Sequence, residues 1–303
     1  MKMFFRSLKR RIGSRMVIGL AHWAGRGGPQ RIKKTGRRLG LLHYYLVWPF
    51  NGKLRNDIAV ALDLTPAEAR SVLRRGWVLN DWAAFEIIAQ ANPELDVAAL
   101  IEPVTVESVD KLKSLRDQKK GAVLLSMHMG NTLLGAARLV RDGYALRAVF
   151  REPHRLPKGY FEQCMDRIGL RPMGMDRANP ARVAMQMLRT LKKGEMVYVL
   201  MDQGTKKDGV EVDFLGKTVQ MPTGIARLAE QTGVDVFPVN LIDDEPNLRF
   251  RIEDPIAMGD DLEENVRNLS RAMENHIREY PHLWGWHHRR WKRYHLKDSK
   301  RNS

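Results

Sequence analysis

The chain of 303 residues lacks cross-links and long apolar segments: it has one cysteine, Cys164, and no run of about 18 apolar residues. A single cysteine excludes a disulfide framework and a cysteine-based metal site. Because the apolar runs are short, no membrane-spanning helix is predicted. A glycine-rich phosphate loop, a zinc finger and an RNA-recognition signature are also missing. At 44% hydrophobic and 28% charged residues, the composition is that of an ordinary globular protein.

Acidic residues are absent from the first 56 positions, which hold 14 lysines and arginines. Residues 287–303 add seven basic side chains against one acid, Asp298. The intervening residues 57–286 have 30 basic and 34 acidic side chains, although the whole chain carries a net charge of +16. A near-neutral body with two basic ends favours an anionic partner, either a membrane surface or a nucleic acid.

The N-terminal segment joins this charge to aromatic and apolar patches. Arg6 precedes the apolar run Met16–Ala21, but the run is short and residues 25–29 offer no signal-peptidase site, so we do not expect secretion. Basic clusters beside tryptophan and tyrosine are typical of a segment lying in a membrane interface. The alternative is that Leu41–Phe50 packs on the protein core. We predict that residues 1–50 form a basic amphipathic membrane-associating segment.

The rest of the chain, residues 51–303, is predicted to form one α/β domain. Thr65–Glu68 has the pattern of a helix start, with a capping threonine, proline and glutamate, and predicts an amphipathic helix to about residue 91. Alternating strands and helices follow, which implies one mixed or mostly parallel sheet flanked by helices on both faces. Strands are expected at 122–126, 146–150, 196–201, 236–242 and 248–253, and helices at 133–140, 160–168, 180–192, 224–231 and 261–280.

Polar side chains follow three of these strands. His128 comes after the first strand, Arg151 after the second, and Asp202 with Gln203 after the third. A lone histidine is more often structural than catalytic. However, reactive groups gather at the carboxyl ends of strands in open α/β sheets, and a base, a cation and a carboxylate at one edge form a plausible acyl-transfer site.

These motifs resemble those of the late acyltransferases of lipid A biosynthesis, within the broader glycerolipid acyltransferase group. That family has His-Phe-Gly-Asn-Trp-Glu after a strand, where this chain has His128-Met-Gly-Asn-Thr-Leu133. The resemblance runs in order from about Leu54 to Lys292. Its other parts are Arg151-Glu-Pro153, Asp202-Gln203, Val212–Gly216, Met221–Ala229 and Pro281–Lys292.

The resemblance implies an acyltransferase without cofactor or metal, at the cytoplasmic face of the bacterial inner membrane as a peripheral or monotopic protein. It would move a fatty acyl chain from acyl carrier protein or acyl-CoA to a phosphorylated lipid acceptor, such as a lipid A precursor. His128 would be the general base, and backbone N–H groups near Gly130 and Asn131, with Arg151, would stabilise the developing oxyanion.

One position departs from the family motif, because Leu133 stands where the family has an acid. Leucine can neither orient nor charge a histidine. Three possibilities follow. Another acid takes the role, with Asp202 as the candidate, or His128 works unassisted on a more nucleophilic acceptor, such as an amine. The third is that the chain binds lipid without catalysis. The last possibility is the main alternative function, and a nucleic-acid binder, supported by charge alone, is the weakest.

Further basic and polar residues are candidates for substrate binding. Thr223 precedes a predicted helix and is either a simple N-cap or part of a phosphate site at the helix N-terminus. The C-terminal run alternates tryptophans with cations, which suits phosphate binding and a membrane interface. We expect Cys164 to be a core residue and no metal site. The substrate-binding candidates are Gly130, Asn131, Gln203, Thr223, Arg289, Arg290 and Lys292, and the tryptophans of the run are Trp284, Trp286 and Trp291.

Overall fold

The fold is built on a seven-stranded, mostly parallel sheet. The structure is a computed structural model that describes residues 2–175, 179–205, 209–244 and 247–288. The strand order is β1-β9-β8-β2-β5-β3-β4, and only the β8–β9 pair is antiparallel. The strands are β1 Val104–Glu107, β2 Val123–Ser126, β3 Leu146–Phe150, β4 Arg171–Gly174, β5 Met196–Leu200, β8 Val236–Asp244 and β9 Asn247–Ile252.

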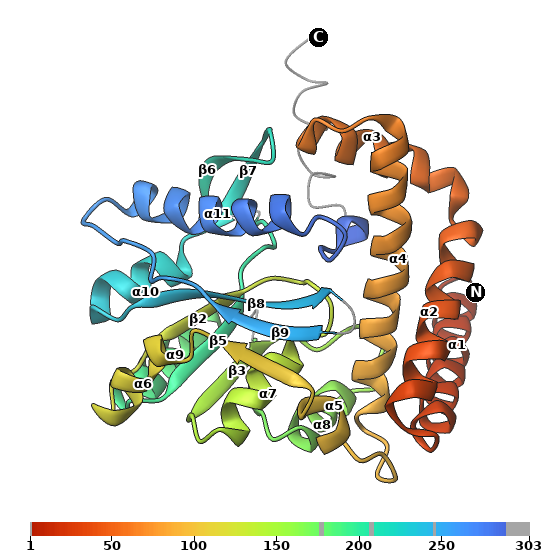
Figure 1. Cartoon of the computed structure of the whole chain (residues 1–303), viewed down its shortest axis with the longest axis horizontal. Helices are drawn as coiled ribbons and strands as arrows, with labels where there is room; N and C mark the ends of the chain where they lie inside the picture. The colour runs from red at the N-terminus through yellow and green to blue at the C-terminus, as the bar shows by residue number, and fades with distance from the viewer. Residues whose placement is uncertain (1, 176–178, 206–208, 245–246, 289–303) are drawn as a thin grey trace.

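Helices cover both faces of the sheet, and a short hairpin stands over one of them (Figure 1). The hairpin pairs β6 Gly209–Phe214 with β7 Lys217–Pro222. On the same face lies α11 Leu262–Glu279, and α7 Leu133–Arg141 lies on the other. The remaining helices after residue 97 are α5 Ala98–Ile101, α6 Asp110–Asp117, α8 Tyr160–Arg167, α9 Pro180–Lys192 and α10 Gly224–Thr232.

The central strands are apolar on both faces because both faces are covered. Successive side chains of a strand point to opposite faces, and β5 illustrates the result. Val197 and Val199 join the core under α9, α10 and α11, whereas Met196 and Tyr198 join the core under α7. The two cores together hold the sheet between two helical layers. The continuous apolar runs of the central strands predict this arrangement, because such runs are typical of parallel strands buried on both faces.

The first four helices of the chain form a layer along one side of the molecule (Figure 1). The last of them begins at the predicted capping box: the Thr65 hydroxyl accepts from the backbone N–H of Glu68, and the Glu68 carboxylate accepts from the backbone N–H of Thr65. The four are α1 Lys2–Gly25, α2 Gly28–Leu46, α3 Trp48–Leu62 and α4 Pro66–Ala89.

Two glycines bring α2 and α4 into close contact. A Cβ on Gly36 would meet Cα of Trp82 at 2.9 Å, and one on Gly40 would meet Cα of Val78 at 2.7 Å. The two glycines are four residues apart and therefore share one face of α2. The helix backbones approach along this face at a spacing that no larger residue permits.

Most of the predicted elements are confirmed, including the fold class. The segments missed after residue 91 are short. β1 and β4 are four-residue strands at the two ends of the sheet, α5 and α6 are short helices, and the β6–β7 hairpin lies where the sequence predicted no strand. The N-terminal 50 residues are largely helical, and α3 runs continuously through residue 50.

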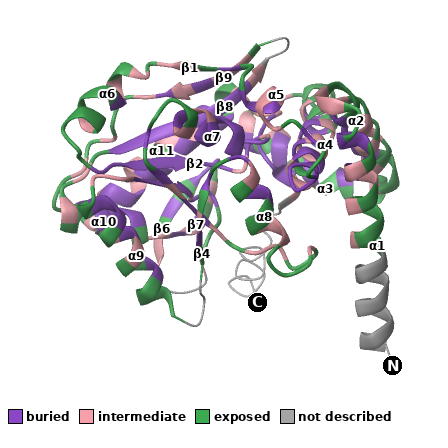
Figure 2. Ribbon diagram, turned by 90° about the horizontal axis from the view of Figure 1, so that it is seen from below, coloured by how far each residue is buried: buried purple, intermediate pink, exposed green. Residues whose placement is uncertain are grey.

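Figure 2 shows exposed residues along α1, α2 and α3. Several of these exposed residues are large and apolar. The alternative expectation, that Leu41–Phe50 packs on the protein core, holds only in part: Tyr44 is buried, but Leu46 is 71% exposed and Phe50 is 60% exposed. No helix in the described part of the chain has the length and apolarity to cross a bilayer.

The close approach of α2 and α4 predicts that Gly40→Ala is destabilising. The added methyl group meets backbone atoms of Trp77 and Val78 that cannot move independently, so we expect a loss of about 1–3 kcal/mol in the free energy of unfolding. Urea unfolding followed by circular dichroism measures this. Gly19→Ala is the matched control: Gly19 is an exposed residue of α1 with nothing within 4 Å of an added Cβ, and alanine there should be neutral or stabilising. Equal effects of the two substitutions would contradict the packing argument.

Candidate active site

The parallel strands β2, β5 and β3 deliver their carboxyl ends to one edge of the sheet. Ser126 pairs with Leu200, and Ala148 pairs with Tyr198, so the three strands end nearly level. His128 follows β2 and Asp202 follows the neighbouring β5. The edge therefore gathers polar side chains that are far apart in the sequence, as expected for an open α/β sheet.

His128 and Asp202 form a hydrogen-bonded pair at this edge. Nδ1 of His128 lies 2.7 Å from Oδ1 of Asp202, and the backbone N–H of His128 donates to Oδ2 at 3.1 Å. The Asp202 side chain is fully buried, whereas the His128 side chain is 33% exposed. The carboxylate is thus hydrogen-bonded to both the ring and the backbone of His128, while part of the side chain remains accessible to solvent.

Trp284 supplies a third donor to the same carboxylate. Its indole Nε1–H donates to Oδ2 of Asp202 at 2.9 Å. The backbone around it is tied to the histidine loop, because Gly285 N–H donates to the carbonyl of His128 and Met129 forms a β-bridge with Trp284. A carboxylate with three donors is favoured in its ionised form. The sequence assigned Trp284 to a membrane-interface run, but Trp284 and Trp286 are 1% and 3% exposed, so that interpretation is wrong for both.

Gln203 contacts the other ring nitrogen of His128, with its Nε2 at 3.3 Å from the histidine Nε2. The two contacts fit one tautomer. The proton resides on Nδ1 and is donated to Asp202, and the lone pair on Nε2 faces the amide donor of exposed Gln203. This is the arrangement in which Nε2 can accept a proton.

The loop after His128 is tied to α4 through a buried carboxyl group. Gly130 adopts a positive φ of 54°, and the next side chain, Asn131, donates from Nδ2 to Oε2 of Glu86 at 2.8 Å. Burial raises the pKa of Glu86 to about 7, and the Asn131 hydrogen bond offsets part of that rise. The Asn131 side chain, predicted to lie near the substrate, is therefore buried against α4.

Hydroxyl groups complete the support beneath the loop. The Thr132 hydroxyl is hydrogen-bonded to Ser126 at 2.9 Å and to the Tyr198 hydroxyl at 2.5 Å. All three side chains are buried. The network joins the ends of β2 and β5 to the start of α7. The loop that carries His128 is therefore held by the strands as well as by α4.

The other predicted site residues are distributed around the same edge. Leu133 is buried in the core under α7 and brings no polar group to the site. Arg151 is exposed after β3 and lies two strands, about 10 Å, from β2. Thr223 occupies the N-cap position of α10 but makes no capping bond; its hydroxyl accepts from Arg227 Nε at 3.2 Å, so the expected cap is wrong.

Cys164 is buried as expected, and burial raises the pKa of its thiol to about 12, which opposes nucleophilic use. The candidates Arg289, Arg290 and Lys292, with Trp291, lie outside the described residues. Within those that are described, no cluster of three or more histidine, cysteine, aspartate or glutamate side chains suits a metal ion.

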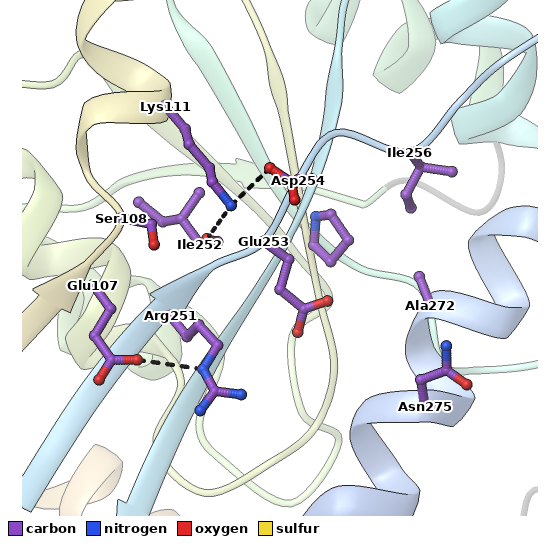
Figure 3. Close-up of a pocket in the computed structure, with 11 residues that line it drawn as sticks. Glu107, Ser108, Lys111, Arg251, Ile252, Glu253, Asp254, Ile256, Ala272 and Asn275 are labelled. Carbon is purple, nitrogen blue, oxygen red and sulfur yellow. Dashed lines mark hydrogen bonds and ion pairs between the residues drawn. The ribbon is translucent and has the colours of Figure 1, made fainter.

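Two cavities lie outside the histidine site. One, of about 440 Å³, lies at the opposite edge of the sheet, where β1 and β9 end (Figure 3). Its charges are paired: Lys111 lies 2.9 Å from Asp254, and Arg251 donates to Glu107. The other, of about 590 Å³, lies between α2, α4 and the end of β8, and among the described residues it is lined by four arginines, three apolar residues and one carboxylate.

The sequence of the chain matches a known protein family. The family model of the bacterial lipid A biosynthesis acyltransferases matches residues 53–293, most of the chain. The chain belongs to this family.

Relatives in the family act on different lipids, to judge by their names. The chain is 28% identical to the phosphatidylinositol mannoside acyltransferase of Mycolicibacterium smegmatis over 192 residues, 62% of each chain. It is 27% identical to the lipid A biosynthesis palmitoleoyltransferase of Escherichia coli over 196 residues, 62% of this chain and 61% of the relative. The chain thus spans less than two thirds of the length of either relative.

The sequence did not predict that Glu86 and Trp284 contact the candidate residues Asn131 and Asp202. Glu86 lies in the predicted amphipathic helix, and its partner Asn131 is 45 residues away in the sequence. Trp284 was noted for its ring and its cationic neighbours rather than for its N–H group. Both act through contacts more than 40 residues away in the chain.

The buried carboxyl of Glu86 predicts a pH-dependent penalty on stability. With a folded pKa of about 7 against an ordinary 4.5, the unfolded chain ionises first as the pH rises, so stability falls between pH 4.5 and 7 by up to about 3 kcal/mol. Glu86→Gln keeps an acceptor for Asn131 and should not show this fall. Urea unfolding of both proteins from pH 4.5 to 8 tests it, with the exposed Glu162→Gln as control. Parallel curves for wild type and Glu86→Gln would contradict the assignment.

Proposed function

We propose that this protein is an acyltransferase that moves a fatty acyl chain from a thioester to a lipid acceptor at a membrane surface, with His128 as general base and Asp202 as its orienting acid. The observation that carries the proposal is the His128–Asp202 pair, with Nδ1 bound to a buried carboxylate and Nε2 on the accessible side. Family membership supports acyl transfer as the reaction.

The reaction follows from this tautomer. An acceptor hydroxyl replaces the Gln203 amide at Nε2 of His128 and gives its proton to that nitrogen while its oxygen attacks the thioester carbonyl carbon. Asp202 holds the ring in place and stabilises the imidazolium that forms. The tetrahedral intermediate then expels the thiolate, which takes the proton from His128. An ester bond has formed, a thioester bond has broken, and the enzyme has returned to its starting state.

The negative charge of the intermediate needs donors close to His128. The positive φ of Gly130 turns the chain directly before the N-terminus of α7, where backbone N–H groups have no partner within the helix. We propose that backbone N–H groups at Gly130 and Asn131 stabilise the oxyanion, and that Arg151, at the same edge, assists with its charge.

The missing motif acid is compatible with this mechanism. Position 133 contributes a core leucine, and the carboxylate comes from the end of β5 instead. The orienting function requires a carboxylate at Nδ1, and its position in the sequence is immaterial. We therefore favour retained catalysis over a lipid-binding role without chemistry. The donor is an acyl carrier protein or coenzyme A thioester, and the acceptor is a phosphorylated glycolipid such as a lipid A precursor.

Substitution of the pair tests the mechanism. Asp202→Asn keeps the shape of the side chain but cannot stabilise a protonated His128, so we expect kcat to fall by about 10³–10⁴, with His128→Ala at least as low. Trp284→Phe removes one of three donors and should have a smaller effect. Transfer of labelled acyl groups from acyl-CoA or acyl carrier protein to membrane lipids measures this.

The matched control is Asp166→Asn, an exposed aspartate on α8, which should behave as wild type. Activity in His128→Ala equal to that of wild type would overturn the assignment of the base. A wild-type protein that binds lipid but transfers nothing from either donor would favour the lipid-binding alternative.

We also propose that α1, α2 and α3 form the membrane-facing surface. Of the eleven large apolar side chains exposed in the described residues, nine lie on these three helices, and the first 56 residues carry no acid. Such a concentration of exposed apolar groups marks an interaction site, and basic side chains beside it suit anionic lipid. This surface supports peripheral attachment at the cytoplasmic face of the inner membrane.

The double variant Leu46→Gln/Phe50→Gln tests this surface. Both side chains are exposed, so the fold should persist while apolar contact with lipid is lost. Burial of each side chain contributes roughly 1–3 kcal/mol, and binding to phosphatidylcholine–phosphatidylglycerol vesicles should weaken at least about tenfold by co-sedimentation. Met185→Gln, exposed on α9, is the control. Unchanged binding of the double variant would place the membrane contact elsewhere.

A further inference from the structure

Four arginines surround the larger of the two cavities outside the histidine site. Arg37 and Arg38 come from α2, and Arg74 and Arg75 come from α4. Asp243 of β8 is the one carboxylate among the described residues that line it, and Leu41, Val78 and Leu79 supply its apolar walls. We call this cavity the arginine cleft. Its volume of about 590 Å³ lies within the range of roughly 300–1,000 Å³ typical of small-molecule sites.

The fold brings these arginines together by packing α2 on α4. Each helix carries its two arginines next to each other in sequence, and the close contact at Gly40 and Val78 sets the two pairs on facing helices. Four arginines against the one carboxylate among the described lining residues leave an excess of three positive charges. Such an excess attracts an anion, and the planar guanidinium fork matches the oxygens of a phosphate.

One residue of the cleft lies at the edge of the sheet that carries His128. β8 is parallel to β2 and adjacent to it, so Asp243 near the end of β8 lies at the same edge as His128. Figure 1 shows β8 pointing toward α4. Arg75 also lies close to His282, whose pKa is lowered to about 4 by burial and by the Arg75 charge. His282 is two residues from Trp284, which holds Asp202.

Residues of α4 link the cleft to the catalytic pair. Asn80, directly after Leu79 of the cleft, donates to the carbonyl of Trp284 at 3.4 Å. Eight residues beyond Val78, Glu86 binds the loop after His128, which corresponds to about 12 Å along the helix. The cleft and the residue that binds the histidine loop therefore lie on one helix about 12 Å apart along its axis, a length comparable to a few sugar or glycerol units.

The cleft also adjoins the exposed apolar surface of α2. Leu41 lines the cleft, and the following Leu42 is 55% exposed, with Tyr45 and Leu46 exposed one turn further on. A group held by the arginines would lie beside apolar side chains that suit acyl chains. Phosphate next to acyl chains is the chemistry of a lipid headgroup at an interface.

We propose that the arginine cleft binds a phosphate group of the lipid acceptor and thereby positions the acceptor for acylation at His128. The inference rests on the proposed function, and it assigns the recognition of the acceptor to residues other than the C-terminal cations. Phosphate esters also occur in a coenzyme A donor, and the experiment separates the two sources.

The test compares Arg74→Gln/Arg75→Gln with wild type in steady-state transfer from acyl-CoA. Acceptors with and without the phosphate group are used in parallel. Loss of charge-assisted contacts should raise KM for the phosphorylated acceptor at least about tenfold, leave KM for acyl-CoA unchanged, and leave KM for the phosphate-free acceptor unchanged. Wild type should discriminate between the two acceptors, and the variant should not.

Arg70→Gln is the matched control, because Arg70 is exposed on α4 but does not line the cleft. It should retain wild-type kinetics. If the double variant raises KM for acyl-CoA but not for a donor truncated to N-acetylcysteamine, and the acceptor kinetics stay unchanged, the cleft serves the donor and the proposal is overturned. Unchanged kinetics with every substrate would overturn it as well.

A direct binding measurement keeps this test separate from the proposed function. Dihexanoyl phosphatidic acid, a soluble lipid phosphate, and dihexanoylglycerol are titrated calorimetrically into wild type and the double variant. We expect wild type to bind only the phosphate and the variant to bind it at least about tenfold more weakly. Binding without any acyl transfer would overturn the proposed function and leave the phosphate site standing. Equal binding by both proteins would remove the site whatever the activity.

Discussion

The carboxylate of Asp202 is the group on which the site depends. It is removed from water, and three N–H donors surround it: the ring and the backbone of His128 and the indole of Trp284. A buried carboxylate without such partners would be costly. With them it joins three parts of the chain that are otherwise distant, namely the ends of β2 and β5 and the segment after α11. The Asp202 carboxylate therefore fixes the position of the histidine ring and that of Trp284 in the segment after α11.

The support around this ion is layered. The hydroxyl network of Ser126, Thr132 and Tyr198 fixes the loop from the strand side, and Glu86 fixes it from α4. The cost of burying Glu86, visible in its raised pKa, is the price of connecting the histidine loop to the helical layer.

What could be predicted from the sequence follows from how local each signal is. The proximity of His128 and Asp202 was predictable because the ends of parallel strands meet at one edge, and each residue follows a clear apolar strand. The capping box of α4 was predictable for the same reason, since it lies within four residues. Glu86 was not, because its partner Asn131 lies 45 residues away in the loop after β2. The arginine cleft was not, because its two pairs of arginines are brought together by the packing of α2 on α4, which depends on Gly36 and Gly40. Position 133 illustrates the limit: the sequence shows that the acid is missing, but only the fold shows which carboxylate lies beside the ring.

Helix α4 has a consequence for which hydroxyl of a lipid is modified. The same helix packs on α2 and α3, the proposed membrane-facing helices, and binds the loop that carries His128. Because a helix is stiff along its axis, a protein bound to a bilayer through the proposed helices would hold its histidine at a height set by the protein rather than by the lipid. The enzyme would then select hydroxyl groups by their depth in the headgroup layer. Chemically identical hydroxyl groups nearer to the acyl chains, or farther from them, would not be acylated.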